Sequence, residues 1–189
     1  ALQEVSGSLV LSIIAGKTLE SLQEKFPTAR NVVRSMPNTP GQIGAGATGY
    51  LFARTPAEDD RVDVECILSA LGKVFPVEEE AHIDCVTAIS GSGPAYVFEF
   101  ACALEEAAQK IGLAPEFSRT LAVETILGAG RLMARSEESP ETLRNYVTSP
   151  NGTTQAALER FAEGDLRGLV AKAVEAAHQR SLELSRPDA

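Results

Sequence analysis

In the first 80 residues, short apolar runs alternate with segments whose apolar residues have helical spacing. Leu9–Ile14 predicts a strand buried on both faces, and Asn31–Met36 predicts a second one. Between them, Thr18–Lys25 places Leu19 and Leu22 at helical spacing. A strand, a short helix and a second strand form a unit whose strands pair in parallel. The alternation continues with a strand, a helix and a strand at Thr48–Ala53, Pro56–Leu71 and Lys73–Val77.

This set of strands is small for a fold of that kind. A strand as apolar as Leu9–Ile14 needs neighbouring strands and helices on both faces, and a sheet of so few strands is marginal. We therefore expect residues 1–80 to be the C-terminal part of a doubly wound, Rossmann-type α/β domain whose earlier strands lie outside this sequence.

After residue 80 the pattern becomes helical throughout. Alanine rises from 8 residues in positions 1–80 to 19 in positions 81–189. Such thin helices, with Gly128–Gly130 inside one of them, predict tight packing across a dimer interface. Helices are expected at 94–111, 115–135, 140–146, 153–163 and 165–185. The predicted fold is α/β: the C-terminal remnant of a Rossmann-type parallel sheet (1–80), followed by an all-helical dimerisation domain (81–189).

Charge and composition exclude several classes of function. The net charge of −9 argues against nucleic acid as a partner, and no apolar run approaches the roughly 18 residues of a membrane span. The two histidines, His82 and His178, are too few for a metal site. Three cysteines without CxxC spacing predict a reducing compartment, the cytoplasm, with each thiol buried as a small hydrophobe. Glu78–Glu80 is expected to be a solvated turn.

The segment Gly44–Gly49 matches the pattern GxGxxG, but its context excludes a dinucleotide-binding fingerprint. That fingerprint lies between a strand and a helix. Here Pro37–Gly41 precedes the glycines and the strand-like Tyr50–Ala53 follows them. We interpret the segment as a flexible loop, and expect any true fingerprint outside these 189 residues.

The strongest candidate site is Ser149–Thr154, with the sequence Ser-Pro-Asn-Gly-Thr-Thr. Proline and glycine favour a tight turn there, and Asn151 tolerates a left-handed backbone. A helical pattern follows directly, so free N–H groups of Gly152, Thr153 and Thr154 should converge at a helix N-terminus, which attracts a carboxylate or a phosphate. The alternative is an ordinary Ser/Thr helix cap. Three hydroxyls and an Asn-Gly pair exceed what one cap requires.

A second glycine-rich segment, Ser90–Tyr96, precedes a helix that begins near Pro94. A helix cap with close backbone packing explains this segment, because proline is favoured at the first helical position. A serine-hydrolase interpretation lacks the G-x-S-x-G pattern and the acid and histidine partners of a triad.

These segments, together with Met36–Pro40, resemble the pyrroline-5-carboxylate reductase family. The run Val147–Thr154 followed by Ala157 and Leu158 is similar to that family's signature, and Thr87–Tyr96 to its other diagnostic stretch. The resemblance covers about residues 9–185 and lacks the family's N-terminal glycine-rich coenzyme loop. Two positions depart from the family pattern, which usually has glycine at Asn151 and a small amide at Tyr146.

The resemblance implies reduction of 1-pyrroline-5-carboxylate to L-proline by hydride transfer from NADPH or NADH, the last step of proline biosynthesis. By resemblance, Ser149 and the Gly152, Thr153 and Thr154 backbone hold the substrate carboxylate. The Thr154 hydroxyl, the catalytic group, bonds the ring nitrogen, where it orients and polarises rather than supplies the proton. Glu137 matches a position near the ring amine.

The same resemblance implies a coenzyme site for NADP or NAD at two strand ends. Ala15 and Gly16 follow the first predicted strand, and Pro37 and Asn38 follow the second. Ligands of open α/β sheets bind at such strand ends. The implied partners are the small-molecule substrate and a second copy of the chain, in a homodimer or larger homo-oligomer.

Two other interpretations remain open at this point. One is a non-catalytic helical dimerisation module, or a truncated fragment unable to bind coenzyme. The other is a different Rossmann-type reductase with a helical C-terminal domain that acts on another small acid. The Val147–Thr154 signature argues against the second.

Overall fold

The computed structural model describes residues 5–186, which group into two compact units. The α/β unit comprises the described residues up to Pro94 and those from Lys172 onward. The helical unit is Ala95–Ala171. None of the helices in the described part of the chain is long and apolar enough to cross a membrane.

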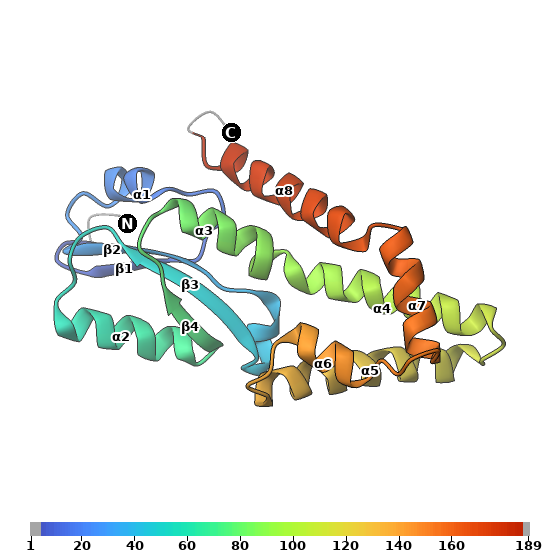
Figure 1. Cartoon of the computed structure of the whole chain (residues 1–189). Coiled ribbons are helices and arrows are strands. Elements are labelled where there is room, and N and C mark those ends of the chain that lie inside the picture. The colour runs from blue at the N-terminus through green and yellow to red at the C-terminus, as the bar shows by residue number, and fades with distance from the viewer. Residues whose placement is uncertain (1–4, 187–189) are drawn as a thin grey trace. The chain divides into compact units, whose positions relative to one another are not determined.

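The α/β unit is built on a four-stranded sheet with the order β1-β2-β3-β4 (Figure 1). Its strands are β1 (Leu9–Ser12), β2 (Asn31–Met36), β3 (Gly46–Phe52) and β4 (Gly72–Pro76). The predicted parallel pairing holds for β1 with β2, and β3 also pairs in parallel with β4.

The β2–β3 pair, however, is antiparallel, so the sheet is mixed rather than wholly parallel. A parallel connection needs a crossover of about a dozen residues or more. Between β2 and β3 the chain forms only the short 3-10 helix η2 (Thr39–Ile43), so it reverses direction instead.

Each face of the sheet is covered by a helix, because neighbouring strand residues point to opposite sides. Val32 packs with Leu19 and Leu22 of α1 (Leu19–Lys25). Val33 packs on the other side with Val64 and other residues of α2 (Glu58–Ser69), and Figure 1 shows the two helices on opposite faces. This double burial explains why β2 has the near-continuous apolar sequence of a central strand.

Arg34, the charged residue within β2, connects the sheet to α3 (Ala81–Val86) and, through Asp84, to α8 (Leu166–Leu184). Its guanidinium is almost fully buried and donates to Glu80 Oε1 at 2.8 Å and to Asp84 Oδ1 at 3.2 Å. Asp84 lies on α3 and also accepts from Ser181 Oγ of α8 at 2.7 Å. The returning C-terminal helix is therefore fastened to the sheet by a buried polar cluster.

The expected solvated turn at Glu78–Glu80 is wrong for Glu80. Besides accepting from Arg34, its Oε1 accepts from the backbone N–H of Leu19 at 2.7 Å, at the N-terminus of α1. Glu80 thus satisfies one helix end and one buried cation at once.

The helices after residue 80 begin with α3 and the π-helix η3 (Thr87–Gly91), which the sequence pattern did not resolve individually. The remaining helices are α4 (Gly93–Lys110), α5 (Pro115–Arg135), α6 (Pro140–Tyr146), α7 (Thr153–Glu163) and α8. Their bounds agree closely with the predicted ones, because Pro94, Pro115 and Pro140 mark three of the starts.

The helical unit has almost no core of its own. Of residues 95–171, all of which the structure describes, only Ser118 and Ala122 are buried. Large apolar side chains are instead exposed along its helices, among them Phe98, Phe117, Leu121, Leu132, Leu169 and Val170.

The predicted burial of the thiols is also wrong, because Cys66, Cys85 and Cys102 are all exposed.

Candidate active site

The Ser149–Thr154 segment forms a tight turn that leads directly into α7. The N–H of Gly152 donates to the carbonyl oxygen of Ser149 at 3.0 Å, and Asn151 has a φ of 60°. This is the left-handed conformation that the sequence predicted for Asn151, one that asparagine tolerates better than most residues. A Cβ on Gly152 would overlap Ser149 Oγ, so any larger residue there would have to displace the Ser149 side chain.

The turn does not form the ordinary Ser/Thr helix cap that the sequence left open as an alternative. The N-cap of α7 is Gly152, and no side chain caps it. Among the residues that the structure describes, the hydroxyls of Ser149, Thr153 and Thr154 make no hydrogen bond. The first helical hydrogen bond of α7 runs from Ala156 N–H to Gly152 O at 3.2 Å, so the N–H groups of Thr153 and Thr154 precede it.

One of the three predicted free donors is already in use. Gly152 N–H is bound to Ser149 O in the turn, which leaves Thr153 and Thr154 to present backbone donors. The positive end of the helix dipole adds to them, so this end of α7 favours a carboxylate. The hydroxyls of Ser149, Thr153 and Thr154 do not cap the helix and can therefore bind a ligand.

Gln155 holds this turn in place, a role that the sequence reasoning missed. Its Oε1 accepts from Asn151 N–H at 2.8 Å, and its Nε2 donates to Glu159 Oε1 at 2.9 Å. The available signal was the spacing, since Asn151, Gln155 and Glu159 follow one another at intervals of four residues. Residues four apart are neighbours on a helix surface.

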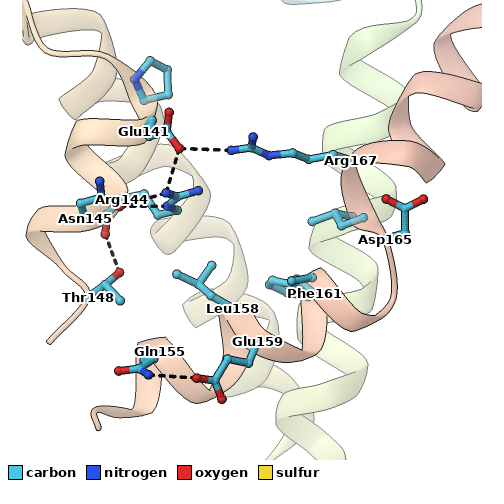
Figure 2. Close-up of a pocket in the computed structure, with 13 residues that line it drawn as sticks. Glu141, Arg144, Asn145, Thr148, Gln155, Leu158, Glu159, Phe161, Asp165 and Arg167 are labelled. Carbon is cyan, nitrogen blue, oxygen red and sulfur yellow. Dashed lines mark hydrogen bonds and ion pairs between the residues drawn. The ribbon is translucent and has the colours of Figure 1, made fainter. Parts of the chain in front are cut away.

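The turn borders a groove of about 750 Å³ in the helical unit, between α6 and α7 (Figure 2). Thr148 and Gln155 line the end nearest the turn, while Leu158 and Phe161 supply an apolar floor. On the opposite rim Glu141 accepts from Arg144 at 3.0 Å and pairs with Arg167 at 3.6 Å. The groove therefore has an apolar base and a charged edge.

Glu137 lies apart from these contacts, in the connection between α5 and α6. It is exposed, and within the described residues it makes no hydrogen bond or ion pair. Its neighbour Glu138 accepts from the Tyr146 hydroxyl at 3.4 Å. A role for Glu137 near the ring amine thus stays a prediction.

The predicted coenzyme residues lie at one edge of the sheet in the α/β unit. Because β1 and β2 are parallel, Ala15 and Gly16 after β1 and Pro37 and Asn38 after β2 follow the same carboxyl edge. Beside Pro37 lies a hollow of about 390 Å³ with the apolar lining residues Met36 and Leu71.

Gly16 and Asn38, two of these four residues, make contacts that hold neighbouring elements together. Gly16 has a φ of 74° and is buried against Leu184 of α8. The Asn38 amide donates to Ser90 O at 3.0 Å and accepts from Ala47 N–H at 2.9 Å, which joins η3 to β3. Ala15 is exposed and Pro37 is half-buried.

The Ser90–Tyr96 segment runs from η3 into α4. A Cβ on Gly91 would lie 2.9 Å from Met36 Cε, so the glycine allows close packing against β2. The close packing inferred from the sequence is thus present at Gly91. The Gly44–Gly49 segment turns out to be partly a strand, since β3 begins at Gly46. Its position before a strand agrees with the rejection of a dinucleotide fingerprint, although the expected loop is wrong beyond Ala45.

The fold defines a two-part protein, with a mixed α/β unit and a helical unit that buries almost none of its residues. A family model for pyrroline-5-carboxylate reductase dimerisation matches residues 80–184. The chain therefore belongs to the pyrroline-5-carboxylate reductase family.

Individual relatives agree with this assignment. The chain is 38% identical over 180 residues to pyrroline-5-carboxylate reductase 2 of Bacillus subtilis, covering 95% of this chain and 64% of that protein. It is 44% identical over 178 residues to the Pseudomonas aeruginosa reductase, covering 94% and 65%. The chain thus spans less than two thirds of the length of these relatives.

Solved structures show the same fold. A pyrroline-5-carboxylate reductase from Coxiella burnetii superposes with a TM-score of 0.92 at 41% identity, covering 98% of this chain and 69% of that one. Plasmodium falciparum pyrroline carboxylate reductase, crystallised with NADP bound, gives a TM-score of 0.88 at 31% identity, with 97% and 74% covered.

Proposed function

We propose that this chain is the substrate-binding and assembly part of an enzyme that reduces 1-pyrroline-5-carboxylate to L-proline with NADPH or NADH. The observation that carries the proposal is the turn before α7, whose backbone donors and hydroxyls are free of any capping role. The names of the relatives and the NADP bound to the Plasmodium protein support it.

The turn suits the two polar ends of this substrate. Thr153 and Thr154 N–H groups, with the Ser149 hydroxyl, bind the carboxylate at the positive end of α7. The Thr154 hydroxyl then reaches the imine nitrogen, which needs a hydrogen-bonding partner as its electron density rises. A threonine hydroxyl is a poor acid at neutral pH, so Thr154 orients and polarises the imine while the proton comes from solvent or a carboxylate.

The coenzyme, when bound, supplies a hydride to the imine carbon. Ala15 and Pro37 would border its nicotinamide end, because both lie at the carboxyl edge of the β1–β2 pair and the hollow beside Pro37 is partly apolar. Gly16 and Asn38 would act by shaping this edge, since the close contact of Gly16 with Leu184 and the Asn38 hydrogen bonds fix the backbone there. The described residues include no pyrophosphate-binding turn of the GxGxxG type. We assign the coenzyme part to residues 1–80 and the substrate part to 81–189. The family match over residues 80–184 supports this division, whereas by compactness the α/β unit extends to Pro94 and also takes in the described residues from Lys172 onward.

A second copy of the chain should cover the helical unit. The helical unit buries only Ser118 and Ala122, and burial of apolar surface is the main favourable term in folding, so we expect the second copy to supply the missing cover. We propose a homodimer, or a larger homo-oligomer, with an interface of roughly 2,000 Å² or more. Three free thiols also fit the reducing cytoplasm as its location.

The decisive experiment measures coenzyme oxidation by the protein extended with its own upstream coding sequence. We expect oxidation of NADPH or NADH that depends on 1-pyrroline-5-carboxylate and yields proline. Absence of turnover in a folded dimer would favour the non-catalytic dimerisation module. A monodisperse monomer at micromolar concentration in sedimentation would contradict the assembly part of the proposal.

A further inference from the structure

A cysteine and a histidine meet where α3 and α8 touch in the α/β unit. Cys85 Sγ lies 3.7 Å from Nε2 of His178, across 93 positions of sequence. The adjacent residue on α3, Asp84, accepts from Ser181 Oγ one turn further along α8. The buried Asp84–Ser181 bond therefore holds the Cys85–His178 pair in register.

This thiol differs from the other two in one respect. All three cysteines are exposed, but within the part of the chain that the structure describes only the Cys85 thiol has a side-chain partner. Cys66 lies on α2 and Cys102 on α4, and within residues 5–186 neither thiol is hydrogen-bonded to a side chain. All three thiols are thus open to solvent, but only Cys85 also has an imidazole nitrogen beside it within the described residues.

We propose that Cys85 is a modification site, a thiol that peroxides oxidise in preference to Cys66 and Cys102 because His178 exchanges its proton. A thiolate, not a thiol, is the nucleophile in such reactions, and an imidazole nitrogen 3.7 Å from the sulfur is close enough to take the thiol proton as the sulfur attacks. This proposal does not depend on reductase activity.

The reaction balances within the pair. The imidazole takes the thiol proton, and the thiolate attacks one oxygen of the peroxide, forming the S–O bond as the O–O bond breaks. The sulfur loses two electrons and the peroxide gains them. The imidazolium returns its proton to the departing hydroxide, so the products are a sulfenic acid and water. The His178 imidazole can serve both steps, whereas the Cys66 thiol has no side-chain hydrogen-bond partner among the described residues.

The test treats the reduced 189-residue chain with hydrogen peroxide at neutral pH and traps sulfenic acid with a 1,3-dicarbonyl probe. Peptide mass spectrometry then gives an initial labelling rate for each cysteine. We expect Cys85 to react at least about fivefold faster than Cys66, which is the comparator because Cys102 lies in the helical unit that a second copy would cover. In His178→Gln that preference should be lost, while His82→Gln removes the other histidine and should keep it.

A second measurement needs no variant. In denaturing urea the preference should vanish, because the pair exists only through tertiary structure. Circular dichroism checks that both glutamine variants are folded. Equal labelling of Cys66 and Cys85 in the native chain overturns the proposal, as does a preference that survives in folded His178→Gln or in urea.

Discussion

Gly16 and Leu184 approach each other so closely that no side chain fits between them. A Cβ on Gly16 would lie 2.7 Å from the carbonyl oxygen of Leu184, and Gly16 has a φ of 74°. Gly16→Ala should therefore lower the free energy of unfolding by about 2–4 kcal/mol, from backbone strain and overlap together. The matched control is Gly44→Ala, with a φ of 69° but open space around it, which should lose only about 1 kcal/mol. Equal losses in urea unfolding of the two variants would mean that the contact with α8 is unimportant.

The buried charge of Asp84 gives a second prediction. Asp84→Ala removes a partner of the buried Arg34 guanidinium and of Ser181, so the free energy of unfolding should fall by about 3–5 kcal/mol. Glu163→Ala breaks the exposed pair with Arg160 and should change it by less than about 1 kcal/mol. Denaturant titration of both variants checks the contrast, and similar values would show that the cluster is dispensable.

Thr48 offers a change that should stabilise the protein. Its hydroxyl is buried on β3 and, among the described residues, has no hydrogen-bond partner. Thr48→Val keeps the shape and removes the unpaired hydroxyl, so the free energy of unfolding should rise by about 1 kcal/mol. Thr87→Val should have the opposite sign, because Thr87 Oγ1 donates to Ile83 O at 2.8 Å. A lower melting temperature for Thr48→Val would contradict the assignment.

Tyr50 predicts a loss of stability at high pH. Burial, and then its hydrogen bond to Glu65, raise the pKa of the Tyr50 phenol to about 12, from 10.0. The folded state therefore keeps a proton that the unfolded state releases, so this contribution is complete below pH 10 and declines as the pH rises toward 12. Glu65→Gln should lower this pKa in a spectrophotometric titration, and an unchanged value would rule out Glu65 as a cause.

The proposed role of the Thr154 hydroxyl is tested by steady-state kinetics of the protein extended with its own upstream coding sequence. Thr154→Val keeps the β-branched shape and the backbone donors, but removes the group assigned to the imine nitrogen. We expect kcat to fall roughly 5- to 150-fold with a smaller effect on substrate affinity, since the lost bond strengthens in the transition state. Ser149→Ala should mainly raise KM, because a carboxylate contact is similar in both states. Unchanged kcat and kcat/KM in folded Thr154→Val would return that residue to a purely structural role.

Local pattern predicted the elements well where one residue marks a boundary. Asn31–Met36 and Pro115–Arg135 appear in the structure with the predicted bounds, since proline fixes where each can begin or end. The turn at Asn151 and Gly152 could also be predicted from the sequence, because few residues adopt the left-handed backbone conformation of Asn151.

Contacts between residues far apart in the sequence could not be predicted from local patterns. The antiparallel β2–β3 pair depends on the length of the connection between them, and η2 was not predicted. Glu80 resembles a surface acid until Arg34 and Leu19, 46 and 61 positions away, are brought beside it. The exposed thiols have the same explanation: general burial habits say little about which side of a particular helix meets its neighbours.

The scarcity of buried residues between 95 and 171 also has a consequence for how the protein is made. If a second copy supplies the missing cover, folding and association become one reaction, and apparent stability then depends on concentration by mass action. Each tenfold dilution would weaken the assembled state by about 1.4 kcal/mol. A newly synthesised chain would pass through an interval in which Phe98, Phe117 and their neighbours face water, and it would be most vulnerable to proteolysis and aggregation while still searching for its partner.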